Sequence, residues 1–458
     1  MEIVIMGGGK VGEKLCETLS SNKHNIVLIE QNEHLLEKLI NTYDINGFIG
    51  NGAAIETQRE SGVASSDIFI AVTEKDEINI IAAILAKRLG AQYTVARVRN
   101  PEYATDLQFV RESLGISLLV NPEYETAHNI ARMLNFPASL SVESFVGEQV
   151  SIIELVIEEG SVLDRLNLIE FRKKYEKVII VAINRQGEII IPAGDDQLHV
   201  GDHIHITGPN KELIRFSLKT LQDHQLTINS ALIVGGGRIG YYLLEELRKS
   251  HVQVKLIENN EGLAENLSFH FTDAEIIVAD GTDQDILDEE AIDQYDAFIS
   301  LTGIDEENLM MSIYAHHRGV KKVITKLDRK RLLEIIDHQN LGSIVTPKQL
   351  VANEIIQFVR SRQESRYANV EALYRMVDNR VEAWQFKIKE ASPVYQVPLS
   401  SLNLKDHLLV AYIIRNNKVI FPTGSDRIEL GDQVIVITKD HKLKDIADIV
   451  YKGKRVRP

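Results

Sequence analysis

The chain has 458 residues, enough for about three domains of ordinary size. Its net charge of −15 excludes a general nucleic-acid binder, because neutralising phosphates requires a basic surface. The apolar runs are all far shorter than the roughly 18 residues of a membrane-spanning helix, so we expect no membrane span. The single cysteine, Cys16, excludes a disulfide framework and a thiolate metal cluster. Because a strand pattern starts directly after the first residue, we expect a cytoplasmic protein.

A glycine-rich turn follows the first apolar stretch. Residues 3–15 read IVIMGGGKVGEKL, a buried-strand pattern followed by G-x-G-x-x-G and then a helical pattern. In this arrangement Gly7 permits a tight turn, Gly9 lets a pyrophosphate approach the backbone, and Gly12 lets helix and strand pack closely. The N–H groups at the start of the helix then bind the phosphates. The turn predicts a dinucleotide-binding fold.

Strand and helix patterns alternate as far as residue 135. Short apolar runs separated by helical segments indicate parallel strands with helices on both faces of the sheet. The second run ends in Glu30, about 20 residues beyond the glycine turn, where an acid accepts hydrogen bonds from ribose hydroxyls. A carboxylate here repels a 2′-phosphate, so we expect NAD or a plain adenosine nucleotide rather than NADP. The predicted strands are 2–6, 25–30, 45–50, 67–72 and 92–98.

Further candidates follow the fourth and fifth strands. Thr73 and Asp76 form the [ST]-x-x-[DE] capping box that begins a helix, but they also lie at the sheet edge where nucleotides bind. We therefore expect Thr73 and Glu74 against the adenosine part of a nucleotide, and structural roles for Asp76 and Glu77. Arg97 closes the fifth strand, where its planar guanidinium group either pairs with phosphates or forms a surface ion pair.

The pattern changes between residues 141 and 210. Strands there alternate at shorter spacing with turn signals, which predicts a small strand-rich domain. His203 and His205 share one strand face, but the equivalent strand later in the chain has no histidine, so we favour a polar strand face over a metal site. The predicted strands are 150–157, 177–183, 187–193 and 202–208.

The whole arrangement occurs twice. Residues 232–244 read LIVGGGRIGYYLL, so that Gly235 repeats Gly7. Almost the same step along the chain leads from Thr73 to Thr302 and from Gly201 to Gly431. A step that stays so nearly constant indicates a tandem duplication. The predicted domains are two Rossmann-like α/β domains with doubly wound parallel sheets, at 1–138 and 229–366, each followed by a small domain, at 139–224 and 367–458.

The two copies differ in charge at equivalent positions. Lys326 stands where the first copy has Arg97, and a lysine offers a point charge in place of a bidentate fork. Asp280 stands where the first copy has Asn51, which adds one negative charge. We therefore expect two nucleotide sites that are not equivalent.

The sequence resembles the TrkA family, the peripheral subunits of bacterial and archaeal Trk potassium uptake systems. The resemblance covers almost the whole chain: both glycine turns, both LIE strand ends, the GNGA and DGTD turns, VTEKDEIN and LTGIDEEN, RVRNPEY, and the P-x-G and GD signature of both small domains. It implies two Rossmann-like RCK (or KTN) domains, each followed by an α+β RCK C-terminal lobe. The TKLDRKR stretch departs from the RxRNP pattern and weakens the match at the second phosphate contact.

The resemblance also implies a function. Members bind NAD(H) or the adenine nucleotides ATP and ADP, form a cytosolic homo-oligomeric ring of dimer to tetramer size, and gate a TrkH-like integral membrane potassium channel subunit from the cytoplasmic face. Carried over by position, the first site comprises Gly7, Gly8, Gly9, Lys10, Val11, Gly12, Glu30, Thr73, Glu74 and Arg97. The second comprises Gly235, Gly236, Gly237, Arg238, Ile239, Gly240 and Glu258.

Two enzymatic alternatives compete with a regulatory, non-enzymatic protein. An NAD-dependent oxidoreductase needs a second domain that supplies an acid–base residue beside the nicotinamide, and the small domains repeat turn residues instead. A methyltransferase has a similar glycine-rich loop and strand-end acid. We find no G-x-S-x-G elbow, no P-loop and no H-E-x-x-H motif in the sequence, and we assign no catalytic or metal-binding residue.

Overall fold

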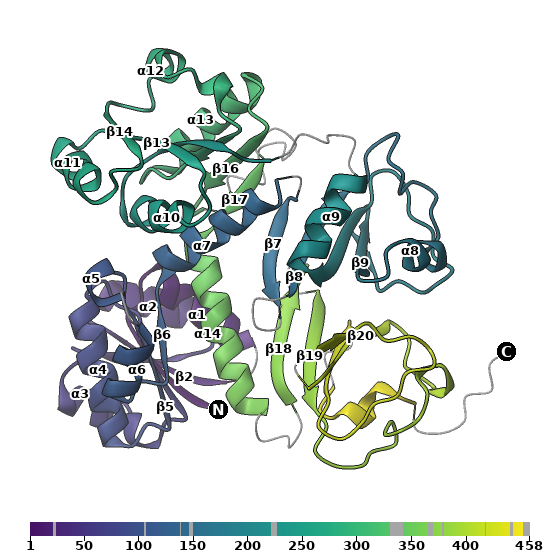
Figure 1. Ribbon diagram of the computed structural model, residues 1–458. Coiled ribbons are helices and arrows are strands. Elements are labelled where there is room, and N and C mark those ends of the chain that lie inside the picture. The colour runs from purple at the N-terminus through teal and green to yellow at the C-terminus, as the bar shows by residue number, and fades with distance from the viewer. Residues whose placement is uncertain are drawn as a thin grey trace. The chain divides into compact units, whose positions relative to one another are not determined.

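The computed structural model describes residues 1–21, 24–104, 107–137, 139–145, 150–220, 227–329, 342–364, 370–377, 380–416, 418–439 and 443–451. The chain forms two compact units (Figure 1). The first consists of Met1–Leu134 and Ile228–Val359, and the second of Asn135–Thr227 and Arg360–Pro458. Each unit therefore combines equivalent segments from both halves of the sequence. Among the described residues, no helix has the length and apolar character that crossing a lipid bilayer requires.

The first sheet of the first unit has six parallel strands in the order β3-β2-β1-β4-β5-β6. Its central strands are apolar and buried because helices cover both faces. The strand order reverses between β1 and β4, which opens a crevice at the carboxyl ends of these strands. The strands are β1 (Glu2–Met6), β2 (Asn25–Glu30), β3 (Asn46–Ile49), β4 (Ile68–Ala71), β5 (Tyr93–Arg97) and β6 (Leu118–Val120). The helices are α1 (Lys10–Ser21), α2 (Glu33–Thr42), α3 (Ile55–Glu60), α4 (Asp76–Leu89), α5 (Pro101–Ala104), α6 (Leu107–Leu114) and α7 (Pro122–Asn135).

The second sheet of this unit repeats the first, with the order β14-β13-β12-β15-β16-β17. The doubly wound fold and its tandem duplication are therefore confirmed, and each sheet gains a sixth strand, β6 or β17, that the sequence patterns did not predict. The strands are β12 (Ser230–Val234), β13 (Gln253–Glu258), β14 (Glu275–Val278), β15 (Ala297–Ser300), β16 (Lys322–Lys326) and β17 (Ser343–Val345). The helices are α10 (Arg238–Arg248), α11 (Glu261–His270), α12 (Gln284–Glu289), α13 (Asp305–His317) and α14 (Pro347–Glu364).

Helix α14 belongs to the second half of the sequence but packs on the first sheet. Its buried residues Val351, Ile355 and Val359 share one apolar core with Leu15 and Leu19 of α1. These three side chains recur about once per helical turn, so they form one apolar face. The first half of the chain therefore depends on the second for part of its core.

Helix α7 makes the reciprocal contact. The ring of Tyr124 meets the ring of Tyr242, on α10, edge to face with 5.6 Å between the centroids. Asn121, just before α7, donates to the Tyr242 hydroxyl at 2.9 Å, and that hydroxyl donates to the carbonyl of Arg99 at 3.0 Å. The two halves of the first unit are joined by an exchange of helices as well as by their sequence.

The second unit contains two five-stranded antiparallel sheets of the same topology, β10-β9-β11-β8-β7 and β18-β19-β22-β20-β21. This agrees with the predicted pair of small strand-rich domains. The first has β7 (Ser141–Phe145), β8 (Val150–Val156), β9 (Ile179–Arg185), β10 (Glu188–Ile190) and β11 (His203–Pro209), with helices α8 (Leu168–Lys174) and α9 (Asn210–Thr220). The second has β18 (Val370–Met376), β19 (Val381–Lys387), β20 (Leu408–Arg415), β21 (Lys418–Ile420) and β22 (Gln433–Thr438).

The repeated Gly-Asp signature of these sheets has a structural role. Arg185 donates two hydrogen bonds of 2.7 Å to the carboxylate of Asp202, and Arg415 donates two of 2.8 Å to Asp432. Burial alone raises the pKa of Asp202, but the hydrogen bonds it accepts outweigh burial and hold this pKa below its usual range. A buried carboxylate is stable here because the bidentate guanidinium group neutralises it.

Candidate nucleotide-binding site

The first glycine turn has the geometry that each of its glycines was expected to provide. Gly7 has a φ of +105°, which side chains rarely permit. A methyl group on Gly12 would overlap the carbonyl oxygen of Gly7, so glycine is needed where α1 packs against β1. Around Gly9, by contrast, no atom of the described residues, its two chain neighbours aside, lies within 4 Å of an added Cβ. The backbone is therefore open at the position where a pyrophosphate is expected.

The second glycine turn repeats these features. Gly235 has a φ of +109°, a Cβ on Gly240 would overlap the carbonyl oxygen of Gly235, and Gly237 faces open space. Arg238 and Ile239 follow as the first residues of α10. The two turns are equivalent in backbone geometry, so differences between the sites come from the side chains around them.

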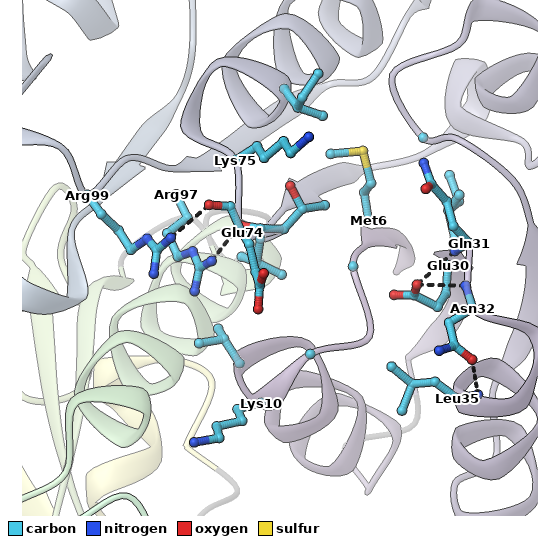
Figure 2. Close-up of a pocket in the computed structure, with 18 of the residues that line it drawn as sticks. Met6, Lys10, Glu30, Gln31, Asn32, Leu35, Glu74, Lys75, Arg97 and Arg99 are labelled. Atoms are coloured by element: carbon cyan, nitrogen blue, oxygen red, sulfur yellow. Dashed lines mark hydrogen bonds between the residues drawn. The ribbon is translucent and has the colours of Figure 1, made fainter. Parts of the chain in front are cut away.

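Glu30 lies at the end of β2 beside the first turn (Figure 2). One carboxylate oxygen accepts the N–H of Gly8 at 2.6 Å, and the other accepts the N–H groups of Gln31 at 2.8 Å and Asn32 at 2.9 Å. These backbone donors fix the carboxylate at the mouth of the crevice. Its remaining lone pairs are acceptors of the kind that ribose hydroxyls need.

Glu258 occupies the same place in the second half. Its carboxylate accepts the N–H of Gly236 at 2.7 Å and the N–H of Asn260 at 2.9 Å. Both strand-end acids are therefore found where the sequence placed them, each in contact with its glycine turn.

A network around Asn79 joins β4, α4 and β5, and the sequence interpretation missed its importance. The side-chain oxygen of Asn79 accepts the N–H of Thr73 at 2.9 Å and its hydroxyl at 2.7 Å. The side-chain nitrogen donates to the carbonyls of Thr73 at 3.0 Å and Arg97 at 2.9 Å. A buried asparagine with all these partners ties the ends of two strands together. Its recurrence at the equivalent position of the second half, as Asn308, was the signal available in the sequence.

The predicted capping box of Thr73 and Asp76 is wrong. The hydroxyl of Thr73 is taken by Asn79, and α4 begins after Lys75, whose side chain makes no capping hydrogen bond. Asp76 instead accepts the backbone N–H groups of Arg99 and the next residue, each at 2.8 Å. In the second half α13 likewise begins without a side-chain cap. The aspartate is structural, as expected, but it holds the loop after β5 and not the helix end.

Arg97 is a buried cation in the wall of the crevice. Only 9% of it is exposed, and one of its terminal nitrogens donates to the carbonyl of Thr73 at 2.5 Å. Its Nε atom is buried and has no hydrogen-bond partner among the described residues. Burial lowers the pKa of Arg97 because the charged form loses its hydration. A buried guanidinium group with an unused donor is suited to an anionic ligand.

Lys326 takes the place of Arg97 in the second half. It is also buried, and its Nζ lies 3.2 Å from the carbonyl of Thr302. The position therefore keeps a cation in both halves, but the lysine lacks the planar fork of the arginine. Asp280 accepts the N–H and the hydroxyl of Thr282, and these hydrogen bonds lower the pKa of Asp280.

The glycine turn, Glu30 and Arg97 of the first half line a pocket of about 950 Å³ in the first unit. Figure 2 shows Glu30 on one side of the glycine turn and Arg97 on the other, with Lys10 at the start of α1. A pocket of this volume accommodates a dinucleotide-sized ligand. The predicted first-site residues that line it are Gly7, Gly9, Lys10, Val11, Glu30, Thr73, Glu74 and Arg97. Gly8 and Gly12 contribute from behind it, through the Glu30 hydrogen bond and the close packing of α1 respectively.

Several pocket residues were not expected from the sequence. Arg99 donates to the carbonyl of Glu74 at 2.7 Å and faces the pocket beside Arg97. Three more come from the second half of the chain: Asp328, Pro347 and Lys348.

His203 and His205 both lie on β11. His203 pairs with Glu154 at 2.9 Å, and this hydrogen bond raises the pKa of His203. Within the described part of the chain, no group of three or more His, Cys, Asp or Glu side chains is placed to hold a metal ion.

Comparison with known proteins assigns the chain to a family. Residues 3–122 and 231–347 match the TrkA-N domain, and residues 152–219 and 385–450 match the TrkA-C domain. The chain belongs to the TrkA family. It is 30% identical over 450 residues to the Trk system potassium uptake protein TrkA homolog of Archaeoglobus fulgidus, covering 98% of this chain and 100% of that protein. It is 29% identical over 457 residues to the Trk system potassium uptake protein TrkA of Vibrio alginolyticus, covering 99% of both.

Solved structures of RCK domains share the fold of this TrkA family member. The RCK domain of GsuK aligns with a TM-score of 0.62 at 16% identity, covering 95% of this chain and 92% of that one. The GsuK channel bound to NAD also aligns with a TM-score of 0.62 at 16% identity, covering 95% of this chain and 76% of that one. At this identity the likeness shows the fold alone.

Proposed function

We propose that this chain is a nucleotide-binding regulatory subunit of a potassium uptake system and has no catalytic activity of its own. The observation that carries the proposal is the buried Arg97, which has an unused donor and lines a pocket whose opposite side holds Glu30. The chain's membership of the TrkA family supports the connection to potassium uptake, because the relatives are named as potassium uptake proteins.

The ligand is NAD(H), with ATP or ADP as alternative nucleotides. Glu30 would accept the ribose hydroxyls of the adenosine, and its charge disfavours a 2′-phosphate. The open backbone at Gly9 would bind the phosphates, together with Arg97. The GsuK channel, which has the same fold, is described with NAD bound, which supports a nicotinamide dinucleotide as ligand here.

Regulation would use the helices that begin at the pocket. Pro122, the first residue of α7, and Pro347, the first residue of α14, both line the pocket. A ligand shifts a conformational equilibrium only through different affinities for the two states, so a nucleotide that moves these helix ends changes the populations. We infer that the controlled partner is a TrkH-like integral membrane channel subunit, bound on its cytoplasmic face by a homo-oligomeric ring of this chain.

A binding experiment on the full chain tests the nucleotide sites. Thermal unfolding with NAD, NADH, ATP and ADP should show a raised midpoint, because a ligand that binds the native state stabilises it. Calorimetry should then resolve two sites. Gly9→Asp should abolish the first and Gly237→Asp the second. A Cβ added at either position has room among the described residues, so the new side chain would enter the space that the phosphates need. If both variants bind as much nucleotide as the parent protein, the glycine turns are not the nucleotide sites.

A flux experiment tests the regulatory role. Potassium uptake into proteoliposomes that contain the channel subunit should depend on this chain and on the added nucleotide, and Gly9→Asp should change that dependence. Steady-state measurements with NADH and a broad substrate panel should show no saturable turnover. Saturable turnover, with flux unaffected by the chain, would favour an oxidoreductase instead.

A further inference from the structure

The first nucleotide pocket is built by both halves of the chain. Asp328 follows β16, and Lys348 is the second residue of α14; both line the pocket whose glycine turn lies in the first half. The Nζ atom of Lys10, in that turn, lies 3.4 Å from the carboxylate of Asp328. The second half therefore contributes charged groups to the phosphate end of the first site.

The position of Asp328 is fixed by its own backbone. Its N–H donates to the carboxylate of Asp305 at 2.9 Å, so the residue is held at the sheet edge whether or not its side chain is paired. The side-chain carboxylate contacts Lys10 and lies 3.8 Å from the Nζ of Lys326. One carboxylate thus partly neutralises two cations, one from each half.

At two equivalent positions beside the pocket, the two halves carry side chains of opposite charge. Asp328 stands at the position equivalent to Arg99, and Lys348 at the position equivalent to Glu123. A terminal nitrogen of Arg99 lies 3.7 Å from a carboxylate oxygen of Glu123. Lys348, by contrast, has no hydrogen bond or ion pair with any other described residue. The composite wall therefore carries one carboxylate that would repel phosphate and one cation free to attract it.

We propose that Asp328 and Lys348 set how many phosphate charges the first nucleotide site accepts. This rests on the proposed function, since it assumes that a nucleotide occupies the pocket. Asp328 opposes added negative charge and occupies Lys10, whereas Lys348 favours it. The pair tunes the site among nucleoside mono-, di- and triphosphates and the dinucleotide NAD. The effect should be strongest at low salt, because Lys10 is largely exposed and its interactions are screened.

The test uses the full chain with Gly237→Asp in the second turn, so that only the first site titrates. Calorimetry with AMP, ADP, ATP and NAD compares the parent, Asp328→Asn, Lys348→Gln and the double variant. Asp328→Asn should raise the affinity for ATP relative to that for AMP by about three- to tenfold. This is the effect expected when one charge–charge interaction at a partly exposed site is removed. Lys348→Gln should weaken ATP relative to AMP, and the double variant should return towards the parent ratio.

Asp273→Asn is the matched control. Asp273 forms a surface ion pair with Arg248, also at 3.4 Å, and does not line the pocket. This variant removes the same charge from the chain and should leave the ATP-to-AMP ratio unchanged. Equal effects on AMP and ATP in Asp328→Asn, or the same shift in Asp273→Asn, would overturn the proposal while leaving nucleotide binding intact. A parent protein that binds none of the four nucleotides would overturn the proposed function as well.

Discussion

A side chain on Gly12 cannot coexist with the carbonyl oxygen of Gly7, because an added Cβ would overlap that oxygen. Gly12→Ala should therefore push α1 away from β1 and destabilise the protein by about 1–3 kcal/mol, as overpacking of a tight contact does. Thermal unfolding followed by circular dichroism measures the loss. Gly9→Ala is the control, since an added Cβ there meets no described atom within 4 Å beyond those of its two chain neighbours. An unchanged midpoint in Gly12→Ala would contradict the packing role.

The sequence predicted the parts of the fold that depend on local pattern. Apolar runs, the glycine spacing and the strand-end acid Glu30 are each set by residues close together in the chain, and the structure has them where they were expected. The failure at Thr73 shows the limit of this reasoning. The capping-box pattern was present, but Asn79, in the first turn of α4, offers the threonine hydroxyl a better acceptor. Local motifs fail when a neighbouring side chain competes for the same hydrogen bond.

The composite nature of the pocket could not be predicted from the sequence. It depends on α14, whose apolar face joins the core around Leu15. Leu15 lies in the first helix of the chain, far from α14 in the sequence. Helical periodicity shows that α14 has an apolar face but does not say which sheet that face covers. The sequence alone therefore does not identify Asp328 and Lys348 as residues of the first pocket.

Arg97 should be more important for binding than for folding. Lys326 keeps the contact with the threonine carbonyl in the second half, so Arg97→Lys should keep the hydrogen bond to Thr73 and the melting temperature. It should still lose the buried Nε donor, and a charge-assisted hydrogen bond contributes about 1.5–3 kcal/mol, so nucleotide affinity should fall at least tenfold. Calorimetry in the Gly237→Asp background measures this. Unchanged affinity would remove Arg97 from the phosphate contacts.

The proposed ring predicts contacts on the outer helices. Ile81 on α4 is 48% exposed and Met310 on α13 is 61% exposed, and they occupy equivalent positions in the two halves. Large apolar side chains exposed at the same place in both halves favour a surface that a second copy covers. The combined substitution Ile81→Glu and Met310→Glu should lower the mass measured by light scattering without lowering the melting temperature. A monomeric parent protein, or an unchanged oligomer in the variant, would contradict this interface.

Glu354 on α14 predicts how stability depends on pH. Its Oε2 atom is buried and has no hydrogen-bond partner among the described residues. Burial, with a smaller contribution from the charge of Glu125, raises the pKa of Glu354 to about 8. The folded chain therefore holds this proton more tightly than the unfolded chain, in which the pKa is about 4.3. Stability from this group is fully present below about pH 4.3 and is lost as the pH rises to about 8.

Glu354→Gln should remove this loss, because an amide stays neutral at every pH. The first half already has an amide, Asn129, at the equivalent position of α7. The variant should melt close to the parent at pH 4.5 and several degrees above it at pH 8.5, since about 1 kcal/mol shifts the midpoint by about 2–4 °C in a unit of this size. Glu265→Gln, on the exposed surface of α11, removes one charge without this burial and should show no such gap. A gap that is the same at both pH values would mean that Glu354 is ionised in the folded protein.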